Sequence, residues 1–195
     1  MKFLVLGGCG IQGRAALYDL SRNPSVDQIT CADIQPDLIH SFDFLDKAKI
    51  QSISLDVNAP TALASIMKNE FDIVLDFLPP QYVRTVAEAA ITSGVHLVNT
   101  NYAYDILNLD TRAKKVGIAI APECGLDPGI DLVIYHHGLA HFDDVYKINS
   151  YCGGIPEKAA CDNPLNYKVS WNLNAVLKSQ NRDATLIKDR KTVHI

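Results

Sequence analysis

The chain has 195 residues, of which 48% are hydrophobic and 21% charged, and its formal net charge is −4. This composition is typical of a globular protein, and the length suggests one large domain, or one domain plus part of another. The acidic balance argues against partners that select basic patches, namely nucleic acids and anionic membranes. The opening MKFLVLGGCG has only a short apolar run that ends in glycines, unlike a signal peptide or a membrane span. We therefore expect a cytoplasmic protein.

Short β-rich runs alternate with helical stretches over the first part of the chain. Strands separated by helices of this length predict βαβ units, and hence a parallel sheet with helices on both faces. Gly94 is the expected C-cap of one helix. In chain order we predict a strand at 2–6, a helix at 14–21, strands at 28–32 and 50–55, a helix at 60–69, a strand at 72–78, a helix at 81–93, a strand at 95–100, a helix at 104–116 and a strand at 118–121.

The alternation stops after the sixth strand. Asp127 is a plausible N-cap and Pro128 suits the first helical position, so we predict a helix over 128–141. A strand is predicted over 144–151, and a hairpin over 184–195 with its turn near Asp189 and Arg190. These elements indicate a second, smaller α+β region.

A glycine-rich turn joins the first strand to the first helix. Gly8, Gly10 and Gly13 have the spacing GxGxxG, and Asp33 follows the second strand twenty residues after Gly13. This spacing permits a tight turn, close approach of the backbone to a pyrophosphate, and close packing of helix on strand. Residues 1–127 are therefore predicted to form a dinucleotide-binding Rossmann domain with a doubly wound parallel sheet. Residues 128–195 would begin an incomplete α+β domain.

Asp33 favours NAD over NADP. A carboxylate after the second strand binds the ribose hydroxyls and repels a 2′-phosphate. No Arg or Lys lies within three residues of Asp33 to receive such a phosphate. The glycines also fit Gly7-x-x-Gly10-x-x-Gly13, which is typical of short-chain dehydrogenases. Those enzymes use a Tyr-x-x-x-Lys pair, and no tyrosine here has lysine four residues later.

Polar or unusual residues follow the predicted strands at one edge of the sheet, where doubly wound folds bind ligands. Each could be an ordinary loop residue, but their joint placement predicts the rim of an active site. They are Asp56 and Val57, then Leu78, Pro79 and Pro80, then Thr100, Asn101 and Tyr102, and finally residues 123–127.

Metal and redox sites are not indicated. The five cysteines form no CxxC pair, so we expect free thiols. His137 and His141 lie four residues apart without an HExxH motif, and histidines near a helix C-terminus suit the helix dipole.

Four motifs resemble the saccharopine dehydrogenase family. They are ISLDVN (53–58), GLDPGID (125–131), SYCGG (150–154) and NPLNYKVSW (163–171). The resemblance implies a Rossmann domain followed by an α+β domain for substrate binding and dimerisation, with this chain as a fragment. It further implies that a nicotinamide cofactor oxidises a CH–NH bond, or reduces an imine, of a small amino acid or amine such as saccharopine, lysine or carboxynorspermidine. A homodimer is expected for the full-length enzyme.

The motifs and the resemblance together give a set of expected site residues. The cofactor would contact Gly8, Gly10, Ile11, Gln12, Gly13, Asp33, Asp56, Val57, Leu78, Thr100, Asp127, Gly153 and Gly154. The substrate would contact Asn101, Tyr102, Tyr167, Lys168 and Trp171, with Tyr102 and Asp127 as candidate catalytic groups by position. For Trp171, core packing is an equal alternative.

Two other classes of function remain open. The chain could be a dinucleotide-binding module without catalysis, acting as a sensor or an assembly surface. It could also be a structural interaction domain that binds no cofactor.

Overall fold

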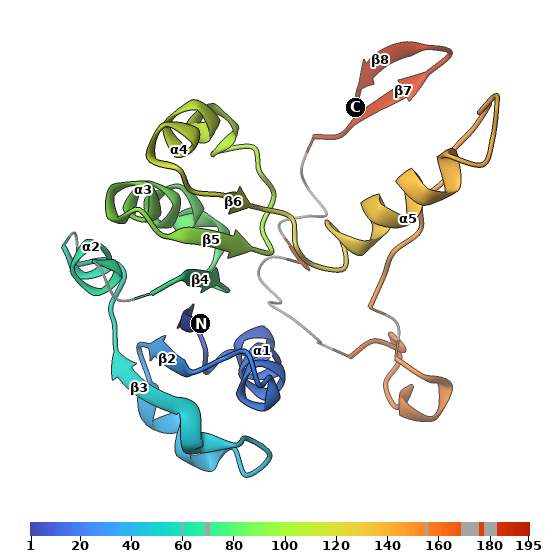
Figure 1. Ribbon diagram of the computed structural model, residues 1–195. Helices are drawn as coiled ribbons and strands as arrows, with labels where there is room; N and C mark the ends of the chain where they lie inside the picture. Colours follow the sequence, from blue (N-terminus) through green and yellow to red (C-terminus); the bar gives the residue numbers. More distant parts are fainter. Residues whose placement is uncertain (60, 69–70, 155, 169–175, 178–182) are drawn as a thin grey trace. The chain divides into compact units, whose positions relative to one another are not determined.

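The computed structural model describes the 195 residues except 60, 69–70, 155, 169–175 and 178–182 (Figure 1). The chain forms two compact units, Met1–Ile148 and Asn149–Ile195. Among the described residues, no helix combines the length and apolar character that a membrane crossing requires.

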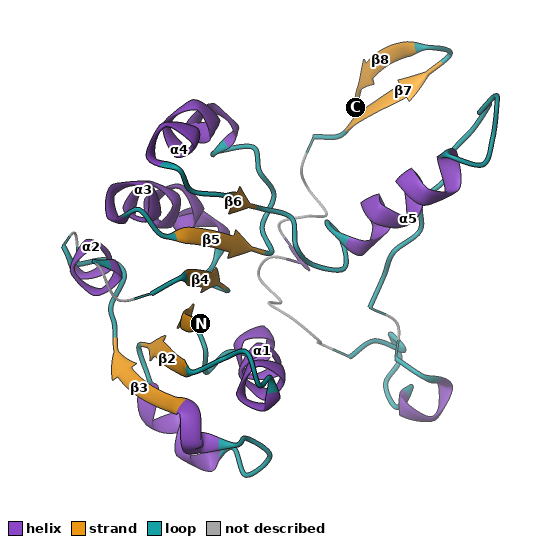
Figure 2. Ribbon diagram, viewed as in Figure 1, coloured by secondary structure: helices purple, strands orange, loops and turns teal. Residues whose placement is uncertain are grey.

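The first unit is built on a parallel six-stranded sheet with the strand order β3-β2-β1-β4-β5-β6 (Figure 2). The strands are β1 (Lys2–Leu6), β2 (Gln28–Asp33), β3 (Ile50–Ser54), β4 (Ile73–Asp76), β5 (His96–Asn99) and β6 (Ile120–Ala121). The α-helices are α1 (Ile11–Arg22), α2 (Ala62–Met67), α3 (Val83–Ser93), α4 (Asp110–Val116) and α5 (Ile130–Leu139). The 3-10 turns are η1 (Pro36–Ser41), η2 (Lys47–Lys49), η3 (Pro80–Tyr82) and η4 (Leu107–Leu109).

Strand β1 lies at the centre of the sheet because its side chains are apolar on both faces. Successive side chains of a strand point to opposite faces. Phe3 and Val5 accordingly belong to one buried cluster, together with Leu17 of α1. Leu4 and Leu6 belong to a second buried cluster, which includes residues of α2, α3 and α4. Two apolar layers therefore enclose the sheet, as predicted for a doubly wound α/β fold.

Strands β2 and β3 are added on one side of β1, and strands β4, β5 and β6 are added on the other side. Leu6 is paired with Ala32 of β2 on one side and with Asp76 of β4 on the other. This change of side at β1 is the topological switch point at which open α/β sheets bind ligands, beyond the carboxyl ends of the strands. The candidate site is therefore expected at the ends of β1 and β4.

Most predicted elements of the first unit are present, but two of its predicted helices differ at their starts. Gly94 ends α3 with φ 70°, as predicted. The helix predicted over 104–116 begins later, with η4, because Ala103 carbonyl accepts the amides of Ile106 and Leu107 in a preceding turn. Asp127 is not an N-cap: α5 begins at Ile130, two residues after Pro128, and Gly129 occupies the cap position.

The second unit contains the turn η5 (Lys158–Ala160) and a two-stranded antiparallel hairpin, β7 (Thr185–Lys188) and β8 (Lys191–His194). This confirms the predicted hairpin. Asp189 (φ 51°) and Arg190 (φ 60°) form its turn, and two positive φ values give the twist that two-residue hairpin loops require. The strand predicted over 144–151 was wrong. No described segment pairs with these residues, and a strand requires a partner.

Candidate functional site

The glycine-rich turn directly follows β1 and is closed by its own backbone. Gly7 has φ 70°, and the Gly10 amide donates to Gly7 carbonyl oxygen at 3.1 Å. A Cβ atom on Gly13 would lie 2.6 Å from Gly8 Cα, closer than real side chains approach. Glycine at position 13 therefore lets α1 pack against the turn, as the GxGxxG spacing predicts.

The N-terminus of α1 is open to an anion. Its N-cap is Gly10, no described side chain caps it, and its first turn has no acidic residue. The first amides of a helix have no partner within the helix, and together with the helix dipole they favour negative charge. The turn and the 12-residue helix α1 therefore fit a dinucleotide pyrophosphate.

Asp33 ends β2 and is held against the glycine-rich turn. Its Oδ2 accepts the Cys9 amide at 3.0 Å, and its Oδ1 accepts the Gln35 amide at 3.0 Å. Each carboxylate oxygen can accept a further hydrogen bond. The side chain is half-buried, so it can present its charge to a ribose at the edge of the sheet.

Two buried thiols lie together at the glycine-rich turn, Cys9 within the turn and Cys31 on β2. Cys9 and Cys31 are buried and free, with their Sγ atoms 3.8 Å apart. Burial, and then the nearby Asp33 carboxylate, raises the pKa of Cys9. Burial also raises the pKa of Cys31 strongly. A Cβ atom on Gly8 would lie 2.5 Å from Cys31 Sγ. Cys124 and Cys161 are also thiols outside any disulfide.

Side chains from distant segments meet at the carboxyl edge of the sheet. Thr100 Oγ1 donates to Gln12 Oε1 at 3.4 Å, which connects the end of β5 to the first turn of α1. Asn101 Nδ2 donates to Leu78 carbonyl oxygen at 3.2 Å, which joins the loops after β5 and β4. The structure thus brings the predicted cofactor residues Gln12, Leu78 and Thr100 next to the predicted substrate residue Asn101.

Two buried polar residues support these loops. Asp76 and Asn99 are register partners at the ends of β4 and β5 and are 0% and 1% exposed. Asp76 Oδ1 accepts the Leu78 amide at 2.9 Å, and Asn99 Oδ1 accepts the Asn101 amide at 2.9 Å. Asp76 Oδ2 and Asn99 Nδ2 have no hydrogen-bond partner among the described residues. Burial raises the pKa of Asp76 to about 7, and the Leu78 amide only partly opposes this shift.

Asp76 and Asn99 were not predicted as site residues, although the sequence carries a signal for both. Each is the polar last residue of a short strand, IVLD or HLVN, in which the two residues before it are apolar. A charged residue at such a position is rarely fully buried without a partner, so Asp76 could have been identified as unusual from the sequence.

The remaining predicted residues of the first unit lie in loops. Asp56 Oδ1 accepts the Asn58 amide, and Val57 packs against the buried cluster that contains Leu4. Tyr102 stacks on Tyr104 with ring centroids 5.5 Å apart. Asp127 is exposed in the turn between β6 and α5.

The residues predicted for the second unit lie in its irregular part. Gly153 and Gly154 are exposed. Lys168 Nζ forms an ion pair with Asp162 at 2.6 Å, and Tyr167 carbonyl oxygen accepts Asn163 Nδ2. Trp171 lies outside the described residues. The arrangement of the two units is not determined, so these residues are not placed relative to the glycine-rich turn.

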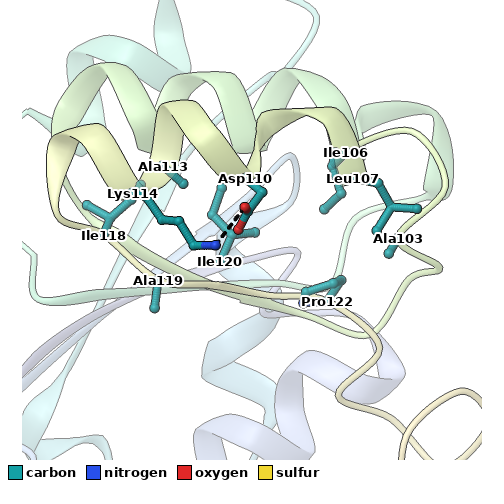
Figure 3. A pocket seen from close by; sticks show the side chains of 10 residues that line it. All are labelled: Ala103, Ile106, Leu107, Asp110, Ala113, Lys114, Ile118, Ala119, Ile120 and Pro122. Carbon is teal, nitrogen blue, oxygen red and sulfur yellow. Dashed lines mark hydrogen bonds and ion pairs between the residues drawn. The ribbon is translucent and has the colours of Figure 1, made fainter.

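A separate hollow of about 370 Å³ lies between α4 and β6 (Figure 3). Ile106, Ile118 and Ile120 contribute apolar walls, and Lys114 and Asp110 pair at 2.8 Å beside it. Its lining residues include none of the predicted cofactor or substrate residues. Among the described residues, no group of three or more His, Cys, Asp or Glu side chains could hold a metal ion.

The strand order, the open N-terminus of α1 and the carboxylate at the end of β2 together define a dinucleotide-binding domain of the Rossmann type. The chain belongs to the saccharopine dehydrogenase family. Residues 3–121 match the saccharopine dehydrogenase NADP binding domain, and residues 125–195 match the saccharopine dehydrogenase C-terminal domain.

Curated relatives agree with this assignment. Saccharopine dehydrogenase (NADP(+), L-glutamate-forming) of Pyricularia oryzae is 38% identical over 152 residues, covering 73% of this chain and 33% of that protein. Its namesake in Saccharomyces cerevisiae is 34% identical, covering 97% and 43%. The mitochondrial alpha-aminoadipic semialdehyde synthase of Mus musculus is 31% identical, covering 100% and 21%. The chain thus spans less than half the length of these relatives.

A solved structure shares both the sequence and the fold. Apo saccharopine dehydrogenase (L-Glu forming) from Saccharomyces cerevisiae superposes with a TM-score of 0.79 at 28% sequence identity. The match covers 100% of this chain and 44% of that one. The predicted fold class is confirmed by this match and by the two family models.

Proposed function

We propose that this chain supplies the dinucleotide-binding part of an oxidoreductase that acts on the CH–NH bond of an amino acid such as saccharopine. Membership of the saccharopine dehydrogenase family supports the reaction class. The observation that carries the proposal is the glycine-rich turn, whose geometry leaves the N-terminus of α1 open beside Asp33. Lysine and carboxynorspermidine are further candidate substrates.

The chain's own residues would bind and orient the reactants. The nicotinamide, when bound, would supply hydride transfer to or from the substrate carbon. The amides at the N-terminus of α1 would hold the pyrophosphate, and Asp33 would hold the adenosine ribose. The Gln12–Thr100 and Leu78–Asn101 contacts keep the loops after β4 and β5 beside the first turn of α1. Asn101 and Tyr102 would therefore meet the substrate next to the cofactor.

The groups proposed for proton transfer, Tyr102 and Asp127, are chosen by their positions in the loops after β5 and β6. Tyr102 carries a phenol in the loop after β5, and Asp127 carries an exposed carboxylate in the turn after β6. Both loops lie at the carboxyl edge of the same sheet. In this proposal Tyr102 and Asp127 are the candidate groups that move a proton to or from the substrate nitrogen or the attacking water. The roles of Tyr167, Lys168 and Trp171 at the substrate, and the homodimer, stay predictions.

The proposal also includes a preference between NAD and NADP. The family model and the Pyricularia and Saccharomyces relatives carry NADP in their names. In this chain the carboxylate of Asp33 stands at the end of β2, and residues 30–36 contain no Lys or Arg. A 2′-phosphate would meet an uncompensated negative charge there. We therefore propose that this chain prefers NAD.

Calorimetric titration with NAD and NADP tests the cofactor preference. We expect NAD to bind about tenfold more tightly or better, a difference of at least about 1.4 kcal/mol. Asp33→Asn should reduce this preference because the amide keeps an acceptor for the Gln35 amide but removes the charge. Asp37→Asn, at an exposed carboxyl four residues away, is the matched control and should leave it unchanged. A wild-type chain that prefers NADP would refute the role given to Asp33.

Activity is tested on the full-length enzyme, by following the nicotinamide absorbance with saccharopine, lysine and carboxynorspermidine in turn. Turnover of one of them supports the oxidoreductase. Dinucleotide binding without any turnover would favour a binding module, and absence of both would favour a structural domain.

A further inference from the structure

Glu123, just after β6, has a backbone conformation that its side chain disfavours. Its φ is 61°, in the left-handed region where a Cβ atom approaches the following carbonyl oxygen. Non-glycine residues in this region are uncommon, and Glu is not among those enriched there. Such strain persists only where the surrounding structure holds it, and it is frequent at functional sites.

Hydrogen bonds to the loop after β5 hold Glu123 in this conformation. The Glu123 amide donates to Asn101 carbonyl oxygen at 3.0 Å, and the Ala103 amide donates to Glu123 Oε1 at 3.0 Å. The Cys124 amide donates to Asn99 carbonyl oxygen at 2.9 Å. These three bonds lie beyond the last register pair of β5 and β6, Val98 with Ala121. The two bonds of Glu123 therefore join the loops after β5 and β6, and the Cys124 amide ties the second loop to Asn99, the last residue of β5.

The two bonds made by Glu123 fall on either side of Tyr102. Its backbone amide fixes the carbonyl of Asn101, and its carboxylate fixes the amide of Ala103. The left-handed turn lets a single residue present an amide and a side-chain acceptor to the same loop. The peptide groups that flank Tyr102 are thus both tied to Glu123.

We propose that Glu123 is the positioning residue for Tyr102, holding its backbone in place at the substrate side of the site. The consequence for turnover rests on the function proposed above. Glu123 acts through Tyr102 and is given no contact with substrate. If Glu123 served only to accept the Ala103 amide, its side-chain oxygen would be sufficient. Glu123 also has a strained backbone and a second bond, to Asn101. A residue that fixes this loop on both sides of Tyr102 needs both features.

Three substitutions separate the side chain from the backbone. Glu123→Gln keeps an acceptor for the Ala103 amide. Glu123→Ala removes the acceptor and leaves the strained φ. Glu123→Gly removes the acceptor and adopts that φ freely. Glu88→Ala, at a half-exposed carboxyl of α3 that pairs with Arg84 at 3.1 Å, is the matched control for loss of a glutamate.

Hydrogen exchange on the chain is the first readout. We expect the Ala103 amide to exchange about tenfold faster or more in Glu123→Ala and Glu123→Gly, since a hydrogen-bonded amide exchanges through local opening and these variants remove its acceptor. Glu123→Gln and Glu88→Ala should exchange at the wild-type rate. Unchanged exchange in Glu123→Ala would overturn the proposal, as would equal acceleration in Glu123→Gln.

Kinetics of the full-length enzyme are the second readout. We expect Glu123→Ala to lower kcat for the amine substrate by about tenfold or more, with the Kd for dinucleotide within about twofold, and Glu123→Gln to recover most of the loss. Wild-type kcat in Glu123→Ala would overturn the proposal. If the wild-type enzyme turned over none of the amines while exchange changed as expected, the positioning of the loop would stand and the proposed function would fail.

Discussion

Replacing Asp76 by Asn isolates the effect of a buried carboxyl at the end of β4. Asp76 is fully buried, and burial raises its pKa from the ordinary 3.8 to about 7. Asn has the same shape, cannot ionise, and retains an oxygen to accept the Leu78 amide, which now bonds Asp76 Oδ1 at 2.9 Å. The substitution therefore changes the titration while preserving the turn that follows β4.

The direction of the pH effect follows from the raised pKa. The unfolded chain releases the Asp76 proton near pH 4, and the folded chain releases it near pH 7. Between these values the folded state binds more protons, so its stability falls as pH rises and levels off above about pH 7. From pH 5 to pH 8 this loss is about 3 kcal/mol, at 1.36 kcal/mol for each pKa unit.

Urea unfolding at pH 5, 6, 7 and 8 measures this loss. The free energy of unfolding of Asp76→Asn, relative to wild type, should rise by about 3 kcal/mol across the series. The absolute difference at one pH also contains the cost of a buried amide donor, about 1–3 kcal/mol, so the change with pH is the quantity to compare. Asp19→Asn, at an exposed carboxyl of α1, is the control. Parallel curves for wild type and Asp76→Asn would refute the reasoning, because Asp76 would then not titrate between pH 5 and pH 8 in the folded state.

Two further substitutions test the glycine-rich turn and the hairpin. Gly13→Ala should lower the free energy of unfolding by about 3 kcal/mol and abolish dinucleotide binding, because the added Cβ would lie 2.6 Å from the Gly8 backbone. Gly138→Ala is its control: no atom lies within 4 Å of the added Cβ in α5, so stability should stay level or rise by up to about 1 kcal/mol. Dinucleotide binding by Gly13→Ala would contradict the role assigned to the turn. Arg190→Gly should stabilise the hairpin by about 1 kcal/mol, since glycine adopts φ 60° without strain. Slower amide exchange in β7 and β8 is the measurement, and faster exchange would count against it.

The parallel sheet was predictable because its strands are short apolar runs between turn residues. A strand buried on both faces needs no alternation of polar and apolar side chains, and β1 shows this pattern. The strand predicted over 144–151 failed because β-propensity describes a surface that fits a partner, and no described segment supplies one. The helix predicted to start at 104 starts later, because a turn before it uses Ala103 carbonyl as the acceptor.

The local part of the candidate site was also predictable. The glycines and Asp33 lie within one βαβ unit, where spacing alone places them together. The contact of Thr100 with Gln12 joins residues 88 positions apart. Asp76 and Asn99 are neighbours only through the register of β4 and β5. Neither can be deduced from local pattern. The left-handed φ of Glu123 is equally hidden, because no sequence rule assigns that conformation to Glu.

The close approach of Gly8 to Cys31 limits which substitutions this protein can accept during evolution. A Cβ atom at position 8 would meet Cys31 Sγ at 2.5 Å, so the side chain at 31 already fills the space that any larger residue at 8 would need. The two positions therefore cannot drift independently. A substitution at 8 would be tolerated only after 31 had become smaller, and each enlargement at 31 would strengthen the requirement for glycine at 8. The fingerprint glycine is thus held by its neighbour on β2 as well as by the approach of a pyrophosphate.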